Sequence, residues 1–173
     1  MIWLYGLTFC RVVIELVFLF SSVGKLRNIS QFQQTITNFR LLPARMSRPT
    51  SLLFVGAEVA VVLLVALGGR FLPPGFLLAI ILLLIFSGAL ISVLARQIQT
   101  SCNCFGSNER PVTQADIWRN AVFVLCALGG SSLTLGRISP EGLELVTWLL
   151  IGGIAIIFVL TASFLGDIVQ LFR

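Results

Sequence analysis

Two cysteines separated by one residue, Cys102 and Cys104, are the side chains whose type and spacing best suit chemistry in this 173-residue chain. A disulfide between them requires a turn, because an extended backbone would hold their Cα atoms near the upper limit of disulfide geometry. Such a disulfide would be strained and easily reduced, which suits electron exchange better than permanent cross-linking. The spacing alone is equally compatible with two reduced cysteines in a loop.

The absence of histidine narrows the chemistry further. Without it the chain has no histidine metal ligands, no Ser-His triad and no histidine haem ligand, and cysteine is left as the side chain suited to redox work near neutral pH. Two thiolates could instead bind a soft metal such as copper(I) or mercury. Zinc would need two further ligands that this loop does not supply, so we predict no metal site.

The composition is typical of an integral membrane protein. The chain is 57% hydrophobic and 11% charged, and its apolar residues form runs of about membrane-spanning length. The net charge of +5 could suggest nucleic acid, but the basic residues lie in loops between the apolar runs, where the positive-inside rule accounts for them. We therefore expect a lipid bilayer and no nucleic acid as partner. The first run lacks a basic region and a small-residue cleavage site, which predicts a retained anchor.

The periodicity predicts an all-α membrane bundle of about five transmembrane helices and one short interfacial helix, forming a single domain over residues 1–173. The interfacial helix is expected over about 30–42, where apolar residues recur at helical spacing opposite glutamines, and Pro43 ends it. Arg45, Arg48 and Pro49 are expected to form the turn into the second span, and Thr113 and Asp116 to start the fourth. The predicted spans are about 7–26, 51–67, 75–95, 114–135 and 143–165.

Ionisable residues inside the apolar runs are candidates for an internal polar site. Arg11 and Glu15 are four residues apart, so they share a helix face, where they can form a structural ion pair or face a proton or a quinone. Lys25 lies at the edge of the same span. Glu58 lies about 12 Å into the second span and needs a partner, either Arg11 or, if protonated, a neighbouring helix. Arg119 could snorkel outward or hold its charge near the cysteines and favour the thiolate, and we favour the second.

The charge distribution predicts the orientation. Five spans place the termini on opposite sides, and most of the twelve Lys and Arg residues then fall on one of them. We expect the N-terminus outside and the Cys102–Cys104 loop at the cytoplasmic face. The basic residues on the cytoplasmic side are Lys25, Arg27, Arg40, Arg45, Arg48, Arg96, Arg110, Arg119 and Arg173, against Arg70, Arg137 and, at a span edge, Arg11.

The whole pattern resembles the methylamine-utilisation MauE family, within the DoxX-like membrane proteins. The resemblance extends to about Leu135, and Cys-x-Cys-Phe-Gly is its most specific part. It implies a four- or five-helix membrane protein active in thiol-disulfide exchange, often alongside a thioredoxin-like partner, during maturation of an exported disulfide-containing protein. Cys102 and Cys104 would be the redox pair. The matching segments are Arg11 to Lys25 with its Gly24-Lys25 ending, Leu41-Leu42-Pro43, Glu58, Cys102-Asn103-Cys104-Phe105-Gly106 and Arg119-Asn120.

The leading hypothesis is a membrane thiol-disulfide oxidoreductase or its redox subunit, in which Arg119 tunes the thiolate of Cys102 or Cys104. Glu58 and the Arg11/Glu15 pair would line an internal polar site, and a quinone is the cofactor that this site could bind. A thioredoxin-like protein or other membrane subunits would be partners. The alternatives are a non-catalytic accessory subunit of a larger membrane complex and a soft-metal-binding membrane protein.

The predicted side of the loop conflicts with a role in exported disulfides. A relay through Cys10, in the first span, and Cys126, in the fourth, would carry electrons across the membrane. Single cysteines in apolar helices are more often small hydrophobic residues, and we expect that role for both.

Overall fold

The computed structural model describes residues 2–38, 44–96, 113–135 and 145–171, and no strand occurs in these ranges. The predicted all-α membrane bundle is confirmed. The helices are α1 (Ile2–Arg27), α2 (Ile29–Asn38), α3 (Ala44–Leu67), the 3-10 turn η1 (Gly69–Phe71), α4 (Leu72–Ala95), α5 (Gln114–Leu135) and α6 (Leu145–Leu171).

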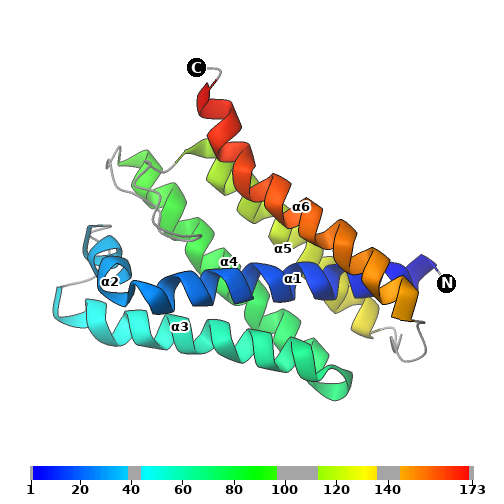
Figure 1. Cartoon of the computed structure of the whole chain (residues 1–173). Helices are drawn as coiled ribbons and strands as arrows, with labels where there is room; N and C mark the ends of the chain where they lie inside the picture. Colours follow the sequence, from blue (N-terminus) through cyan, green and yellow to red (C-terminus); the bar gives the residue numbers. More distant parts are fainter. Residues whose placement is uncertain (1, 39–43, 97–112, 136–144, 172–173) are drawn as a thin grey trace.

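Helix α1 is the centre of the bundle (Figure 1). It packs against α3, α5 and α6 and touches α2 at its C-terminal end, while α4 packs between α3 and α5. The core is aliphatic and aromatic, with fully buried side chains on α1, α4 and α5 that include Ile14, Phe76 and Phe123. Since α1 contacts most of the other helices, its inward-facing side chains can form a site with several of them.

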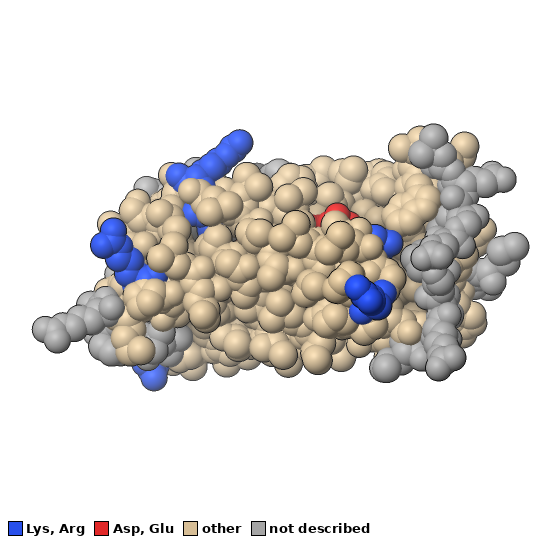
Figure 2. Space-filling model, turned by 90° about the horizontal axis from the view of Figure 1, so that it is seen from below, with Lys and Arg blue, Asp and Glu red and all other residues tan. Residues whose placement is uncertain are grey.

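The outer surface is that of a multi-pass membrane protein. Within the described ranges, four helical segments are long and apolar enough to cross a membrane: Trp3–Arg27, Met46–Leu67, Gly69–Ala95 and Val146–Ser163. Large apolar side chains such as Leu53 and Ile157 are exposed, as expected for side chains that face lipid. Figure 2 shows one face that is uncharged over most of its length, with Lys and Arg side chains gathered toward its two ends. Membrane crossing by α5, which carries several buried polar residues, stays a prediction.

The starts of α3 and α5 show how local sequence sets the helix ends. Helix α3 begins at Ala44 and contains Pro49, so the turn predicted around Pro49 is wrong. Pro49 is the sixth residue of the helix, so it removes one backbone hydrogen bond, the one to the Arg45 carbonyl, and the helix continues through it. The helix start predicted at Thr113 is confirmed, because the Thr113 backbone N–H and hydroxyl both donate to Asp116 Oδ2, at 2.9 and 3.1 Å. This is the acidic half of a capping box.

Close packing of α5 on α4 depends on Gly130. A β-carbon at this position would lie 2.4 Å from a ring atom of Phe76, which is fully buried. At the neighbouring Gly129 the nearest atom would be 3.9 Å away, an ordinary contact. Two adjacent helical glycines therefore differ sharply in the space around them.

We expect Gly130→Ala to destabilise the bundle by about 1–3 kcal/mol through overpacking, even though alanine favours the helix. Gly129→Ala is the matched control and should be neutral or stabilising. Thermal unfolding in detergent measures both, and adding Phe76→Leu to Gly130→Ala should recover part of the loss. Equal stability of the two alanine variants would contradict the packing described.

Candidate functional site

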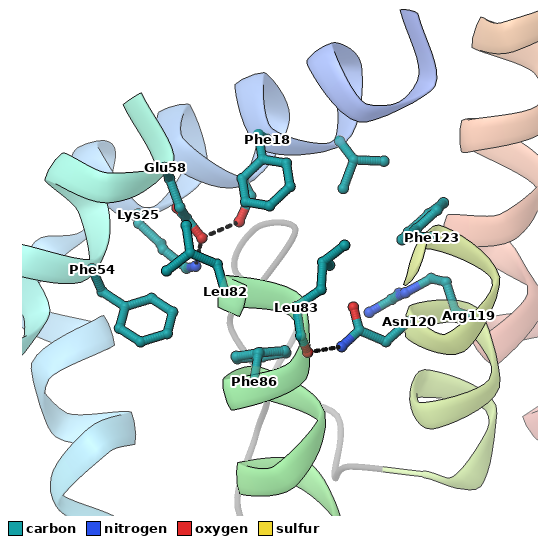
Figure 3. A pocket seen from close by; sticks show the side chains of 12 residues that line it. Phe18, Lys25, Phe54, Glu58, Leu82, Leu83, Phe86, Arg119, Asn120 and Phe123 are labelled. Atoms are coloured by element: carbon teal, nitrogen blue, oxygen red, sulfur yellow. Dashed lines mark hydrogen bonds and ion pairs between the residues drawn. The ribbon is translucent and has the colours of Figure 1, made fainter. Parts of the chain in front are cut away.

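A small cavity lined by apolar, polar and charged side chains lies inside the bundle between α1, α3, α4 and α5 (Figure 3). Its volume of about 40 Å³ fits one to a few water molecules. Pockets for larger organic ligands usually measure about 300 Å³ or more, so a quinone would require the cavity to widen. The lining side chains are Val17, Phe18, Ser21, Lys25, Phe54, Glu58, Leu82, Leu83, Phe86, Arg119, Asn120 and Phe123.

The cavity is built around an ion pair between Lys25 of α1 and Glu58 of α3. The Lys25 ammonium donates a hydrogen bond to Glu58 Oε1, and the two side chains are only 2% and 5% exposed. Ser21, one turn before Lys25 on α1, donates to the same oxygen at 3.2 Å. Glu58 therefore has its expected partner, but that partner is Lys25 and not Arg11.

Aromatic rings enclose the Lys25 ammonium. Its nitrogen lies 4.8 Å from the ring centre of Phe32, 5.8 Å from that of Phe54 and 5.6 Å from that of Phe86. Cation–π attraction is stronger where water is excluded, so these rings help to offset the cost of burying the charge. The rings and the carboxylate together fix the ammonium in one place.

Among the residues that the structure describes, none forms a hydrogen bond with the second carboxylate oxygen of Glu58, although this oxygen is buried. A buried acceptor without a donor costs about 1–3 kcal/mol, and such groups in native proteins usually have a specific reason. Glu58 lines the cavity, so Oε2 is available to a small donor such as a water molecule. The site can thus accept a hydrogen bond or a proton inside the membrane bundle.

Arg119 and Asn120 enter the cavity from α5, across from the ion pair (Figure 3). Asn120 donates from Nδ2 to the Leu83 carbonyl oxygen at 3.1 Å and to the Ser87 hydroxyl at 2.7 Å, which ties α5 to α4. Arg119 is buried and lies 3.3 Å from the carboxylate of Asp116. The inward position excludes the outward snorkelling considered from the sequence.

Arg11 and Glu15 lie elsewhere. Arg11 donates from Nε to the Val65 carbonyl oxygen at 3.0 Å and from Nη2 to that of Ala66 at 2.9 Å, so it caps the C-terminal end of α3. Its guanidinium also lies 5.6 Å from the ring centre of Trp148. Glu15 is half-buried on α1 within electrostatic range of Arg11. Neither residue lines the Lys25–Glu58 cavity.

Cys102 and Cys104 lie outside the described residues. The helices that flank their loop are described, because α4 ends at Ala95 and α5 begins at Gln114. Both helices line the cavity, and Arg119 is five residues into α5, about 7.5 Å along the helix axis. On α5 the cavity thus lies near the helix start that follows the loop, whereas on α4 its lining residue nearest to the loop, Phe86, is nine residues before the helix end, about 13.5 Å along the axis.

Sequence reasoning did not identify Ser21 or the rings around Lys25 as part of the site. Ser21 carried a usable signal, since it is four residues before Lys25 and shares its helix face. The rings carried none, because Phe32, Phe54 and Phe86 come from three helices whose approach depends on tertiary packing.

Comparison with known proteins identifies relatives of the whole chain. The sequence model of the family described as Methylamine utilisation protein MauE matches residues 3–133. The chain is 34% identical over 163 residues to the methylamine utilization protein MauE of Paracoccus denitrificans, and 33% identical over 166 residues to that of Paracoccus versutus. Each alignment covers 91% of this chain and 86% of the relative. No solved structure matches the chain.

We expect Lys25→Met to destabilise the protein by about 3–5 kcal/mol, because it leaves the Glu58 carboxylate buried without its cation. Arg27→Met, two residues on and exposed, is the matched control and should change stability by less than about 0.5 kcal/mol. Unfolding in detergent measures both variants.

The double variant Lys25→Met/Glu58→Leu tests whether the two charges act as a pair. With no charge left in the cavity it should be more stable than Lys25→Met alone. A loss equal to the sum of the two single losses would show that the residues are not coupled.

Proposed function

The chain belongs to the MauE family, and from this membership we propose that it serves methylamine utilisation as a membrane thiol-disulfide redox protein. Cys102 and Cys104 are the redox pair, and their exchange assists maturation of a disulfide-containing partner. A thioredoxin-like protein or another membrane subunit exchanges with them. The proposed orientation has the N-terminus outside and the loop at the cytoplasmic face, from the distribution of basic residues.

The observation that supports this proposal most is the charged cavity beside the first turns of α5, the helix that follows the cysteine loop in the chain. Buried ionisable groups in a membrane protein are costly and usually functional, and here two ion pairs, Lys25–Glu58 and Arg119–Asp116, lie together. Of these groups, Arg119 is the cation closest to the loop along the chain, and its partner Asp116 offsets part of its charge. Positive charge near a cysteine favours the thiolate, which is the nucleophile in disulfide exchange.

The proposed exchange has two steps. One thiolate of the Cys102–Cys104 pair attacks a disulfide of the partner and forms a mixed disulfide, releasing one partner thiolate. The second cysteine then attacks the mixed bond, so the pair becomes a disulfide and the partner gains two electrons and two protons as a dithiol. The reverse sequence oxidises the partner. The free oxygen of Glu58, through water in the cavity, is the proposed acceptor for a thiol proton.

Thiol labelling tests the redox pair. In a Cys10→Ser/Cys126→Ser background, we expect Cys102 and Cys104 to react with a membrane-impermeant maleimide only after mild reduction, in either intact cells or inverted vesicles. The preparation in which the cysteines react, intact cells or inverted vesicles, then shows which side of the membrane the loop faces. If both thiols label fully without reduction and oxidants never protect them, the proposal fails and an accessory-subunit role takes its place.

Substitution at Glu58 tests the proton acceptor. Glu58→Gln should slow the exchange of Cys102 and Cys104 with glutathione disulfide by about 100-fold, the lower end of the usual loss of a general base. Glu15→Gln on α1 is the matched control, because Glu15 lies outside the cavity. Thermal unfolding of each variant separates a lost proton acceptor from lost structure. Equal exchange rates in the two variants would show that Glu58 is not the proton acceptor.

A further inference from the structure

A second pair of thiols lies inside the bundle, between Cys10 of α1 and Cys126 of α5. Both side chains are half-buried and free, and the two thiols are close enough to interact electrostatically. They pack against the same apolar core as Leu7 and Phe123. They are also neighbours across the interface of α1 and α5, although 116 positions separate them in the sequence.

The face of α5 explains why they meet. Cys126, Gly129 and Gly130 are spaced at i, i+3 and i+4, so they form one small-residue face on the helix. The sulfur of Cys10 lies close to the backbone of Gly130 and 3.9 Å from the β-carbon position of Gly129. Cys10 of α1 therefore packs on the face of α5 that carries Cys126, one turn before Gly129.

We propose that Cys10 and Cys126 form a second redox site, an intramembrane dithiol that closes to a disulfide joining α1 to α5. Both S–H bonds break and one S–S bond forms, while two electrons and two protons reduce a lipid-soluble quinone to its hydroquinone. The acceptor must be apolar, because both thiols pack against the apolar core and Cys10 lies on a helix that is long and apolar enough to span a membrane. This site does not depend on the activity proposed for Cys102 and Cys104.

The chain allows a clean test, because Cys102→Ser/Cys104→Ser leaves Cys10 and Cys126 as its only cysteines. The purified variant is incubated in liposomes with duroquinone, whose fully substituted ring resists thiol addition. We expect both thiols to become unreactive to a maleimide after denaturation, the intact mass to fall by two hydrogen atoms, and one hydroquinone to form per chain. Dithiothreitol should restore both thiols, and the protein should run as a monomer without reductant.

The matched control moves one thiol by a single position. Adding Cys126→Ser and Leu125→Cys to the same background keeps two cysteines but places one on an exposed face of α5, since Leu125 is 67% exposed. This control should stay reduced. The wild-type protein is also treated with the quinone and digested. We expect a disulfide-linked pair of peptides that contain Cys10 and Cys126, which would show that the disulfide does not result from the serine substitutions.

Two results would overturn the proposal. One is that the Cys102→Ser/Cys104→Ser variant keeps two free thiols after incubation with the quinone, while a cooperative thermal unfolding transition shows that it is folded. The other is that the Leu125→Cys control oxidises equally fast, which would show unspecific oxidation.

Discussion

The structure depends on a charged pair that is buried between the helices of the bundle. Lys25 and Glu58 are both nearly inaccessible, so each charge is stable only because the other is present. This requirement fixes the relative position of α1 and α3. The neighbouring side chains stabilise the same two charges. Ser21 donates a hydrogen bond to the Glu58 carboxylate, and aromatic rings from α2, α3 and α4 enclose the Lys25 ammonium.

On the other side of the cavity, neutral hydrogen bonds and close packing hold α5 against α4. Asn120 joins α5 to α4 through Leu83 and Ser87, and Gly130 allows the Phe76 ring to pack between the same two helices. These contacts determine where the start of α5 lies, and Thr113 and Asp116 determine that it starts there. The same group of contacts thus determines the position of the cavity wall on α5 and the point at which α5 begins.

The sequence was sufficient for features that depend on one helix at a time. Apolar runs predicted an all-α membrane bundle, and Thr113 with Asp116 predicted a helix start. Glu58 was recognised as needing a partner, but depth along one helix does not show which part of another helix reaches it. Arg11 reaches the end of α3 instead, while Lys25, taken as a residue at the edge of its span, belongs to a helix that continues to Arg27. Helix crossings are decided by packing, which no local pattern encodes.

The two proposed thiol sites are linked by α5. Phe123 lines the cavity, and Cys126 is one turn further along, about 4.5 Å on the helix axis. Phe18 lines the cavity from α1, two turns beyond Cys10. A disulfide between Cys10 and Cys126 would therefore fix the separation of α1 and α5 next to the cavity wall.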